Sequence, residues 1–241
     1  MNLSLSRTAA LITASLAMLQ LAAPAQAALI TETYTPSTVT TAIPDDNAVF
    51  TSFLESITGS SIQYLTRVTI SLDLRGTSSG LGFASDMAVT LLQSPVGSAP
   101  SGSDPSAILL NRVGITGSNP VGMTYDGWNI TLSDSGASDI HLEAVLGGVT
   151  TGTYQPDGRA NPTDTLRPAM LSVFNGGTGN GDWRLNVADL AAGGTMKLVN
   201  WSLTLEGNDI AAPIPEAGTW AAGLGLTVLA AGGFWRARRR K

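Results

Sequence analysis

Short segments in which hydrophobic and polar residues alternate with a period of two recur along the chain from Ala28 to Ile210. In the segment 67–73, for example, Val68, Ile70 and Leu72 fall on one face and polar residues fall on the other. This period is that of a β-strand with one buried face, and no sustained 3.6-residue period precedes residue 213. The pattern therefore predicts an all-β domain.

Further strands are predicted where shorter apolar segments lie between turns rich in Gly, Ser, Asp and Pro. These segments are 86–92, 107–111, 128–132 and 140–146. Residues 95–105 are predicted to form a polar loop. Three prolines within 154–168 predict an irregular connection that crosses between sheets.

The last third of the domain carries the clearest alternation. Trp183, Leu185 and Val187 occupy every second position, and Trp201 and Leu203 do the same after an Ala-Gly turn. The spacing predicts a hairpin whose two tryptophans face the core. Truncating a buried tryptophan to alanine typically costs ~3–5 kcal/mol, so we expect this hairpin to anchor the domain.

The first 27 residues have the three parts of a secretory signal peptide. Arg7 supplies the positive charge, residues 9–21 form an apolar run, and Ala25 and Ala27 are the small residues before a cleavage point. We expect cleavage after Ala27. The protein is therefore predicted to be exported, with a domain spanning 28–210.

Residues 213–241 combine a Pro215-Glu216 pair, an apolar run over 219–235 and a basic end. The basic end consists of Arg236, Arg238, Arg239, Arg240 and Lys241, with one intervening alanine. At ~1.5 Å per residue the apolar run would form a transmembrane helix of roughly 25 Å, against a hydrocarbon core of ~30 Å. Positive charges that follow a span stay in the cytoplasm, so the domain is expected on the outer side of the membrane.

This arrangement resembles the PEP-CTERM sorting signal, which exosortases recognise in exported proteins of Gram-negative bacteria. The resemblance implies passage through the inner membrane, processing by an exosortase-type protease, and delivery to the cell surface or extracellular matrix. The sequence departs from the motif at Ala217, where the family usually has proline. Two alternatives remain: a plain tail anchor, and a sortase signal, whose cleaved threonine would again be replaced by Ala217.

A second resemblance rests on the blocks 171–176 (LSVFNG), 181–189 (GDWRLNVAD) and 198–203 (LVNWSL), with looser matches over 86–91 and 109–114. Together these blocks are similar to the P domain of proprotein convertases, also called the Homo B domain. Departures are Gly194, where the family usually has Asp, and Met196, where it usually has Gly. The resemblance implies a jelly-roll β-sandwich of about eight strands, often containing calcium. In convertases a protease domain precedes this module, whereas here we expect the module to stand alone.

Composition narrows the range of possible functions. The segment 28–210 carries 17 Asp and Glu against seven Lys and Arg, which leaves a net charge of −10. Binding to nucleic acid by phosphate neutralisation is therefore not expected. The chain has no cysteine, which excludes disulfides, thiol catalysis and cysteine-ligated zinc. Packing alone must stabilise the domain.

Two groups of residues could form a functional site: a possible catalytic triad and a set of loop aspartates. The segment 76–80 matches the G-x-S-x-G nucleophile motif around Ser78, and Asp134 or Asp139 followed by His141 would complete a triad. That motif requires a strand, a tight turn and a helix in a parallel sheet, which the sequence does not predict. His141 is the only histidine, and we expect it to be a surface or half-buried strand residue.

Aspartates that fall in predicted loops could bind a hard cation such as calcium. They are Asp45, Asp46, Asp126, Asp134, Asp139, Asp157 and Asp182. Because no regular spacing organises them, we expect solvated carboxylates rather than a metal site.

The sequence thus predicts an exported, non-enzymatic β-sandwich protein, structural or binding in role. A secreted hydrolase using Ser78 and His141 is the alternative, and a module that binds matrix polysaccharide or a surface protein is a third. Exposed aromatic residues would favour the third, but most of the few aromatics are assigned to the core.

Overall fold

The computed structural model describes residues 28–37, 40–77, 83–122, 126–143 and 148–209. These residues form ten strands and three short 3-10 helices. The strands are β1 (Leu29–Tyr34), β2 (Thr41–Ala42), β3 (Asn47–Ile57), β4 (Tyr64–Gly76), β5 (Met87–Ser94), β6 (Ser106–Asn111), β7 (Gly127–Leu132), β8 (Val149–Tyr154), β9 (Gly181–Asp189) and β10 (Met196–Asn208). The 3-10 helices are η1 (Ala84–Asp86), η2 (Ile140–Leu142) and η3 (Leu171–Phe174).

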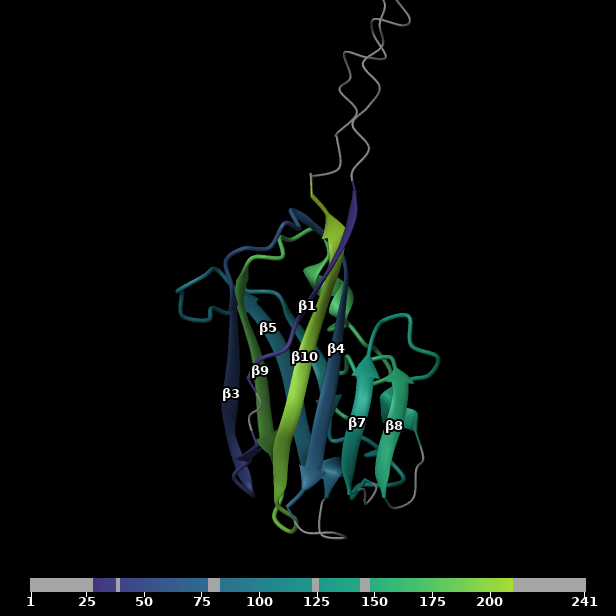
Figure 1. The fold of residues 1–241 in the computed structure, drawn as a ribbon. Helices are drawn as coiled ribbons and strands as arrows, with labels where there is room; N and C mark the ends of the chain where they lie inside the picture. Colours follow the sequence, from purple (N-terminus) through teal and green to yellow (C-terminus); the bar gives the residue numbers. More distant parts are fainter. Residues whose placement is uncertain (1–27, 38–39, 78–82, 123–125, 144–147, 210–241) are drawn as a thin grey trace, which may run out of the picture.

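The strands form two sheets that pack face to face, as Figure 1 shows. One sheet has the order β1-β10-β4-β7-β8, with β2 also paired to β10. The other has the order β3-β9-β5-β6. The all-β prediction and the β-sandwich are therefore confirmed. Ten strands exceed the eight expected, and β7 and β8 pair in parallel, unlike the antiparallel pairing of a jelly roll.

The core lies between the sheets and is built from the alternating residues of both. In β4, Val68, Ile70, Leu72 and Leu74 are buried, while the residues between them are more exposed. The strands predicted from alternation at 67–73, 86–92, 107–111 and 128–132 correspond to β4, β5, β6 and β7. Alternation located these strands because each has one face on the core.

The predicted hairpin of the last third is wrong in its pairing. β9 lies between β3 and β5 in one sheet, whereas β10 lies between β1 and β4 in the other. Alternation shows which face of a strand is buried but not which sheet it joins, and residues 190–195 carry the chain across the sandwich. The five residues of the predicted hairpin are nevertheless buried: Trp183, Leu185, Val187, Trp201 and Leu203.

The strand predicted at 140–146 is also wrong over its first residues. Residues 140–142 form η2, because Asp139 caps this turn by accepting a hydrogen bond from the His141 backbone N–H at 3.0 Å. Residues 144–147 lie outside the described part of the chain. The prediction of an irregular connection at 154–168 holds beyond Tyr154, where β8 ends.

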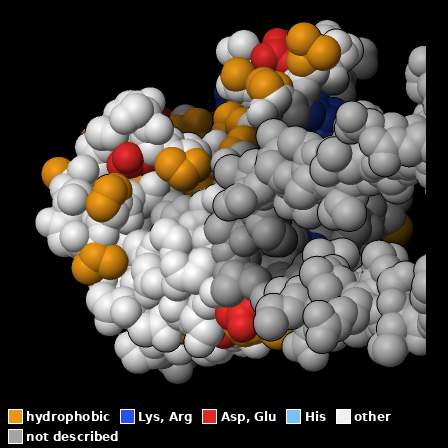
Figure 2. Space-filling view, turned by 90° about the horizontal axis from the view of Figure 1, so that it is seen from above, with side chains coloured by type: hydrophobic (Ala, Val, Ile, Leu, Met, Phe, Trp, Pro, Cys, Tyr) orange, Lys and Arg blue, Asp and Glu red, His pale blue; other side chains and the backbone are white. Residues whose placement is uncertain are grey.

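The described domain begins and ends at the same end of the sandwich. β1 runs antiparallel to β10, so that Leu29 lies opposite Asn208, and the Ala28 N–H donates to Asp209 Oδ1 at 3.2 Å. In Figure 2, which looks onto this end, hydrophobic side chains of the described residues occur singly or in small groups. The start of β10 lies at the opposite end, roughly 40 Å away at ~3.3 Å per residue.

Several predicted segments lie outside the described residues. These are the signal peptide (1–27), the Pro-Glu pair, the transmembrane helix (219–235) and the basic end (236–241). No helix within the described ranges is long and apolar enough to cross a membrane.

The core assignment predicts a large loss of stability when either buried tryptophan is truncated. Trp183→Ala and Trp201→Ala should each lower the free energy of unfolding by ~3–5 kcal/mol in chemical denaturation. Trp201→Phe should cost less than Trp183→Phe, because the Trp201 Nε1 has no hydrogen-bond partner, whereas the Trp183 Nε1 donates to the Gly179 carbonyl. Leu54→Ala, at a side chain 51% exposed on β3, is the control and should change little. Equal effects of Leu54→Ala and Trp183→Ala would contradict the core assignment.

Candidate functional site

The residues predicted to direct export and sorting lie outside the described part of the chain. They are Ala25, Ala27, Pro215, Glu216, Arg236, Arg238, Arg239, Arg240 and Lys241. Ser78, the nucleophile of the hydrolase alternative, lies in the undescribed segment 78–82. Within the described residues, buried charges gather around Asp157 and around Asp189.

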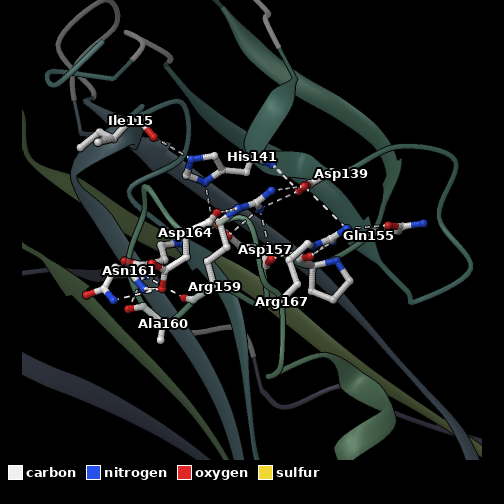
Figure 3. A network of polar contacts seen from close by, with 12 residues as sticks. Ile115, Asp139, His141, Gln155, Asp157, Arg159, Ala160, Asn161, Asp164 and Arg167 are labelled. Atoms are coloured by element: carbon white, nitrogen blue, oxygen red, sulfur yellow. Dashed lines mark hydrogen bonds and ion pairs between the residues drawn. The ribbon is translucent and has the colours of Figure 1, made fainter. Parts of the chain in front are cut away.

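The first group is a network of ion pairs on the irregular connection that follows β8 (Figure 3). The Asp157 side chain is fully buried; its Oδ2 lies 2.6 Å from His141 Nδ1, and its Oδ1 accepts a hydrogen bond from Arg159 at 3.0 Å. Arg159 also pairs with Asp139 at 2.5 Å, which holds the network to η2. Each buried charge therefore has an opposite charge beside it.

Further hydrogen bonds fasten the connection to its surroundings. Arg167 Nε donates to the Asp157 carbonyl at 2.9 Å, and Arg167 Nη1 donates to Gln155 Oε1 at 2.8 Å. Asn111, the last residue of β6, donates its backbone N–H to Asp157 Oδ2 at 3.2 Å and its side-chain amide to the Arg159 carbonyl at 3.0 Å. The network thus joins the connection, η2 and the edge strand β6.

His141 is a buried cation of this network and not the surface or half-buried strand residue that the sequence suggested. Its Nε2 lies 2.9 Å from the Ile115 carbonyl, and its Nδ1 faces the Asp157 carboxylate. Both partners only accept hydrogen bonds, so each ring nitrogen must carry a proton. Burial lowers the pKa of His141, but the hydrogen bond and charge of Asp157 outweigh it and raise that pKa above 6.5.

The described members of the predicted triad are committed to structural contacts. A general base needs an unprotonated nitrogen within reach of its nucleophile, and both nitrogens of His141 are occupied. Asp139 binds the His141 backbone and Arg159 rather than the imidazole, and Asp134 caps η3 by accepting the N–H groups of Leu171 and Ser172 at 3.0 and 2.7 Å. This arrangement counts against the hydrolase alternative.

The expectation of solvated loop aspartates is wrong for the most buried ones. Asp157 is 0% exposed and the Asp139 side chain is 10% exposed. Asp182 lies inside β9, where it accepts hydrogen bonds from Ser56 Oγ at 2.7 Å and the Gly97 N–H at 3.1 Å. These contacts and the charge of Arg184 outweigh its desolvation, so the pKa of Asp182 lies below its ordinary value. Asp45, by contrast, is exposed as expected.

The second group gathers at the end of the sandwich opposite the described termini. Asp189 ends β9 and is 0% exposed, and neither carboxylate oxygen has a hydrogen-bond partner. Its neighbours are also acidic: Asp45, Asp46 and Asp86. Burial, together with these negative charges, raises the pKa of Asp189 to about 7 from an ordinary 3.8. The Ala191 backbone N–H lies near the carboxylate without forming a well-aligned hydrogen bond, and it acts in the opposite direction.

A surface hollow of about 390 Å³ lies beside this acidic group. Its lining residues are Phe83, Asp86, Arg112, Pro120, Val121, Gly122, Ala191, Ala192 and Gly193. The Arg112 Nε is buried there without a hydrogen-bond partner. Burial raises the pKa of Asp86 above its ordinary value, and the positive charge of Arg112 opposes part of this rise. A charged and partly apolar hollow of this kind could receive a polar ligand.

The calcium implied by the P-domain resemblance would need oxygen ligands, and the acidic group around Asp189 contains carboxylates. Carboxylate oxygens are the ligands that calcium prefers, and both oxygens of Asp189 are buried and unpaired. Within the described ranges, however, no three His, Cys, Asp or Glu side chains already lie close enough to enclose a metal ion.

Sequence reasoning missed Asp189, Asp86, Arg112 and Arg159. Asp189 could have been found, since it continues the inward alternation of Trp183, Leu185 and Val187 and is therefore directed to the core. No comparable signal marks Arg159, because it lies in an irregular connection without periodicity.

Comparisons with known proteins assign no family. No protein-family model and no curated protein matches the chain. Among solved structures, two crystal structures of a serine protease of Aeromonas sobria are similar, one of the protease and one of its complex with the chaperone ORF2. Both are 18% identical and cover 76% of this chain but 28% of the matched chain, with TM-scores of 0.39 for the protease and 0.38 for the complex. These values assign no activity.

The buried network predicts that removing the charge of Asp157 is costly. Asp157→Asn leaves His141 and Arg159 buried without a full counter-charge, so the free energy of unfolding should fall by roughly 3–5 kcal/mol. Asp104→Asn is the matched control, because Asp104 accepts only local hydrogen bonds from Ser101. Denaturant titrations of both variants make the comparison. Similar losses for the two would show that the network does not stabilise the fold.

The raised pKa of Asp189 predicts a pH dependence of stability in the presence of a metal chelator. Because the folded pKa of about 7 exceeds the ordinary value of 3.8, the folded state binds the proton more tightly. The protonated Asp189 carboxyl therefore makes its full contribution to the free energy of unfolding below about pH 4. This contribution falls as the pH rises through about 7, by roughly 4 kcal/mol in total. The difference in unfolding free energy between wild type and Asp189→Asn isolates this effect from other titrations. A difference independent of pH would contradict the assignment.

Proposed function

We propose that this protein is an exported, non-enzymatic β-sandwich, displayed at the cell surface or in the extracellular matrix of a Gram-negative bacterium. The observation that carries the proposal is the placement of both ends of the described domain. Ala28 and Asp209 are joined by a hydrogen bond of 3.2 Å at one end of the sandwich (Figure 1). The chain therefore enters and leaves the domain at one point.

This placement suits a domain carried on its C-terminal segment. A sandwich whose first and last strands pair along β1 and β10 resists separation of its ends, since the strand pair would have to be sheared along its length. In the proposed precursor, the 213–241 segment crosses the inner membrane and the opposite end of the sandwich projects away. The acidic group and the neighbouring hollow lie at that projecting end.

A non-enzymatic role is supported by the state of the only histidine. His141 is buried and donates hydrogen bonds from both ring nitrogens, so it is unsuited to act as the base of a hydrolase. The projecting end, with Arg112 and Asp86 in its hollow, is instead suited to contact a partner. We propose a matrix polysaccharide or a surface protein for this role.

We also propose that the sandwich is a jelly-roll variant related to the P domain. Two of the three sequence blocks that carry this resemblance, 181–189 and 198–203, lie in β9 and β10, which contribute Trp183 and Trp201 to the core from the two sheets. The sorting segment would be read by an exosortase-type protease at the outer face of the inner membrane.

The sorting proposal predicts that the Pro-Glu pair controls processing but not insertion. Replacing Pro215 and Glu216 with alanine should leave insertion intact, because the apolar run and the basic end remain. Release should stop, so that full-length protein accumulates in the inner membrane. Intact mass measured in membrane and surface fractions of the native host reports both results.

Pro213→Ala combined with Ile214→Ala is the matched control, because it changes two residues directly before the pair and should be processed normally. If the Pro215 and Glu216 variant is processed like wild type, the sorting proposal is wrong. If wild-type protein at steady state retains residues 236–241, a plain tail anchor replaces it.

A further inference from the structure

Two opposite charges face the hollow at the projecting end of the sandwich without pairing with each other. Asp86 is 8% exposed, and within the described ranges its carboxylate accepts no hydrogen bond. The Arg112 Nε is buried there without a partner as well. Arg112 is near enough to oppose part of the rise that burial causes in the pKa of Asp86, yet no ion pair joins them in the described fold. Buried polar groups of this kind are unfavourable until a bound molecule completes their hydrogen bonds.

Backbone hydrogen bonds hold both charges and an aromatic ring around the hollow. The Asp86 N–H donates to the Phe83 carbonyl at 2.9 Å, so that both residues belong to one 3-10 turn. The Arg112 N–H donates at 2.9 Å to the carbonyl of Met87, which directly follows Asp86. The Phe83 ring packs on Gly193, where an added Cβ would lie 3.1 Å from the ring. The three side chains therefore keep their places before a ligand arrives, which lowers the cost of binding.

A hydroxyl group is the ligand chemistry that satisfies both charges at once. A carboxylate only accepts hydrogen bonds and a guanidinium only donates them, whereas a hydroxyl does both. One hydroxyl can therefore donate to Asp86 while it accepts from Arg112. The apolar part of the lining is suited to the C–H groups of such a ligand: it includes Phe83, Pro120 and Val121.

A sugar ring carries adjacent hydroxyls and C–H groups together. The hollow measures about 390 Å³, within the range of roughly 300–1,000 Å³ that is usual for small-ligand sites. Its few polar groups on an apolar wall are also typical of such sites. Size and chemistry thus agree on a ligand of one or a few sugar units.

We propose that this hollow binds an uncharged sugar unit of a polysaccharide through Asp86, Arg112 and Phe83. The inference rests on the proposed binding role of the projecting end and narrows its partner to a sugar. The acidic neighbours decide between charged and uncharged sugars, since the charges of Asp45 and Asp189 act on the same group as that of Asp86. A sugar that carries a carboxylate would meet these negative charges and be repelled.

The experiment measures sugar binding by the full-length protein in a detergent without a sugar head group, because a maltoside would compete. The uncharged probes are the methyl glycosides of glucose, galactose, mannose and N-acetylglucosamine, followed by dextran, hydroxyethyl cellulose and galactomannan. The charged probes are methyl glucuronide and carboxymethyl cellulose. Saturation-transfer NMR reports binding of the glycosides, and affinity electrophoresis reports binding of the polymers.

At least one uncharged probe should bind, and both charged probes should bind at least tenfold more weakly than the best uncharged one. Binding of a glycoside and its polymer alike assigns the hollow to a terminal sugar unit. Binding of a polymer alone assigns it to an internal stretch of the chain.

Asp86→Asn should weaken binding of the best probe at least tenfold, because a hydrogen bond to a charged group is lost. The same variant should not lower the unfolding midpoint, because it removes a buried charge that has no hydrogen bond. A residue with only a structural role would show the opposite pattern. Phe83→Leu keeps an apolar side chain but removes the ring, and it should weaken binding about threefold or more.

Asp126→Asn is the matched control. Asp126 precedes β7 at the same end of the molecule but belongs to the other sheet, and its variant should bind the probe like wild type. The proposal is overturned if no uncharged probe binds at millimolar concentration, or if the charged probes bind as tightly. It is equally overturned if Asp86→Asn binds like wild type, or if Asp126→Asn loses binding to the same extent. None of these outcomes bears on the proposed display, which the processing of the C-terminal segment tests separately.

Discussion

The buried carboxylate of Asp157 holds the longest connection of the described fold in place. Residues 155–180 carry the chain from β8, at the edge of one sheet, to β9, in the middle of the other. Backbone hydrogen bonds pair Asp157 and Gly158 with β6, but the irregular connection lacks a ladder of its own. The ion pairs of Asp157 with His141 and Arg159 supply the missing constraint.

Asp157 and Asp189 show two different fates of a buried aspartate. Asp157 is surrounded by positive groups and hydrogen-bond donors, so its charge is compensated inside the fold. Asp189 is surrounded by carboxylates, and its pKa is raised to about 7. At neutral pH the charge of Asp157 is therefore balanced by its neighbours, whereas an ionised Asp189 has no opposite charge among the neighbours that shift its pKa.

The sequence predicted the parts of the fold in which one face of a strand is buried. β4, β5, β6 and β7 were found this way, and Trp183 and Trp201 were placed in the core. β3 was missed because Val49, Phe50 and Leu54 are exposed, which removes the alternation on which the prediction depends. The pairing of β9 was mistaken because periodicity carries no information on sheet membership.

The candidate site was harder to predict than the fold. His141 was taken for a surface or half-buried residue because its burial depends on Asp157 and Ile115, which are distant in sequence. Asp189 could have been recognised, since it continues an inward-facing alternation into a charged residue. Local sequence patterns cannot identify buried charges whose partners come from other segments. Such charges make up the candidate site of this protein.

The most direct test of this account is the protonation state of His141, which NMR can follow without ambiguity because the chain has one histidine. The imidazole signals should be measured as a function of pH in the folded protein. The account predicts a pKa above 6.5 and protons on both ring nitrogens at neutral pH, with Nδ1–H directed to Asp157 and Nε2–H directed to Ile115. A neutral imidazole with a pKa below 6.5 and one free nitrogen would contradict the structural role and would return His141 to consideration as a catalytic base.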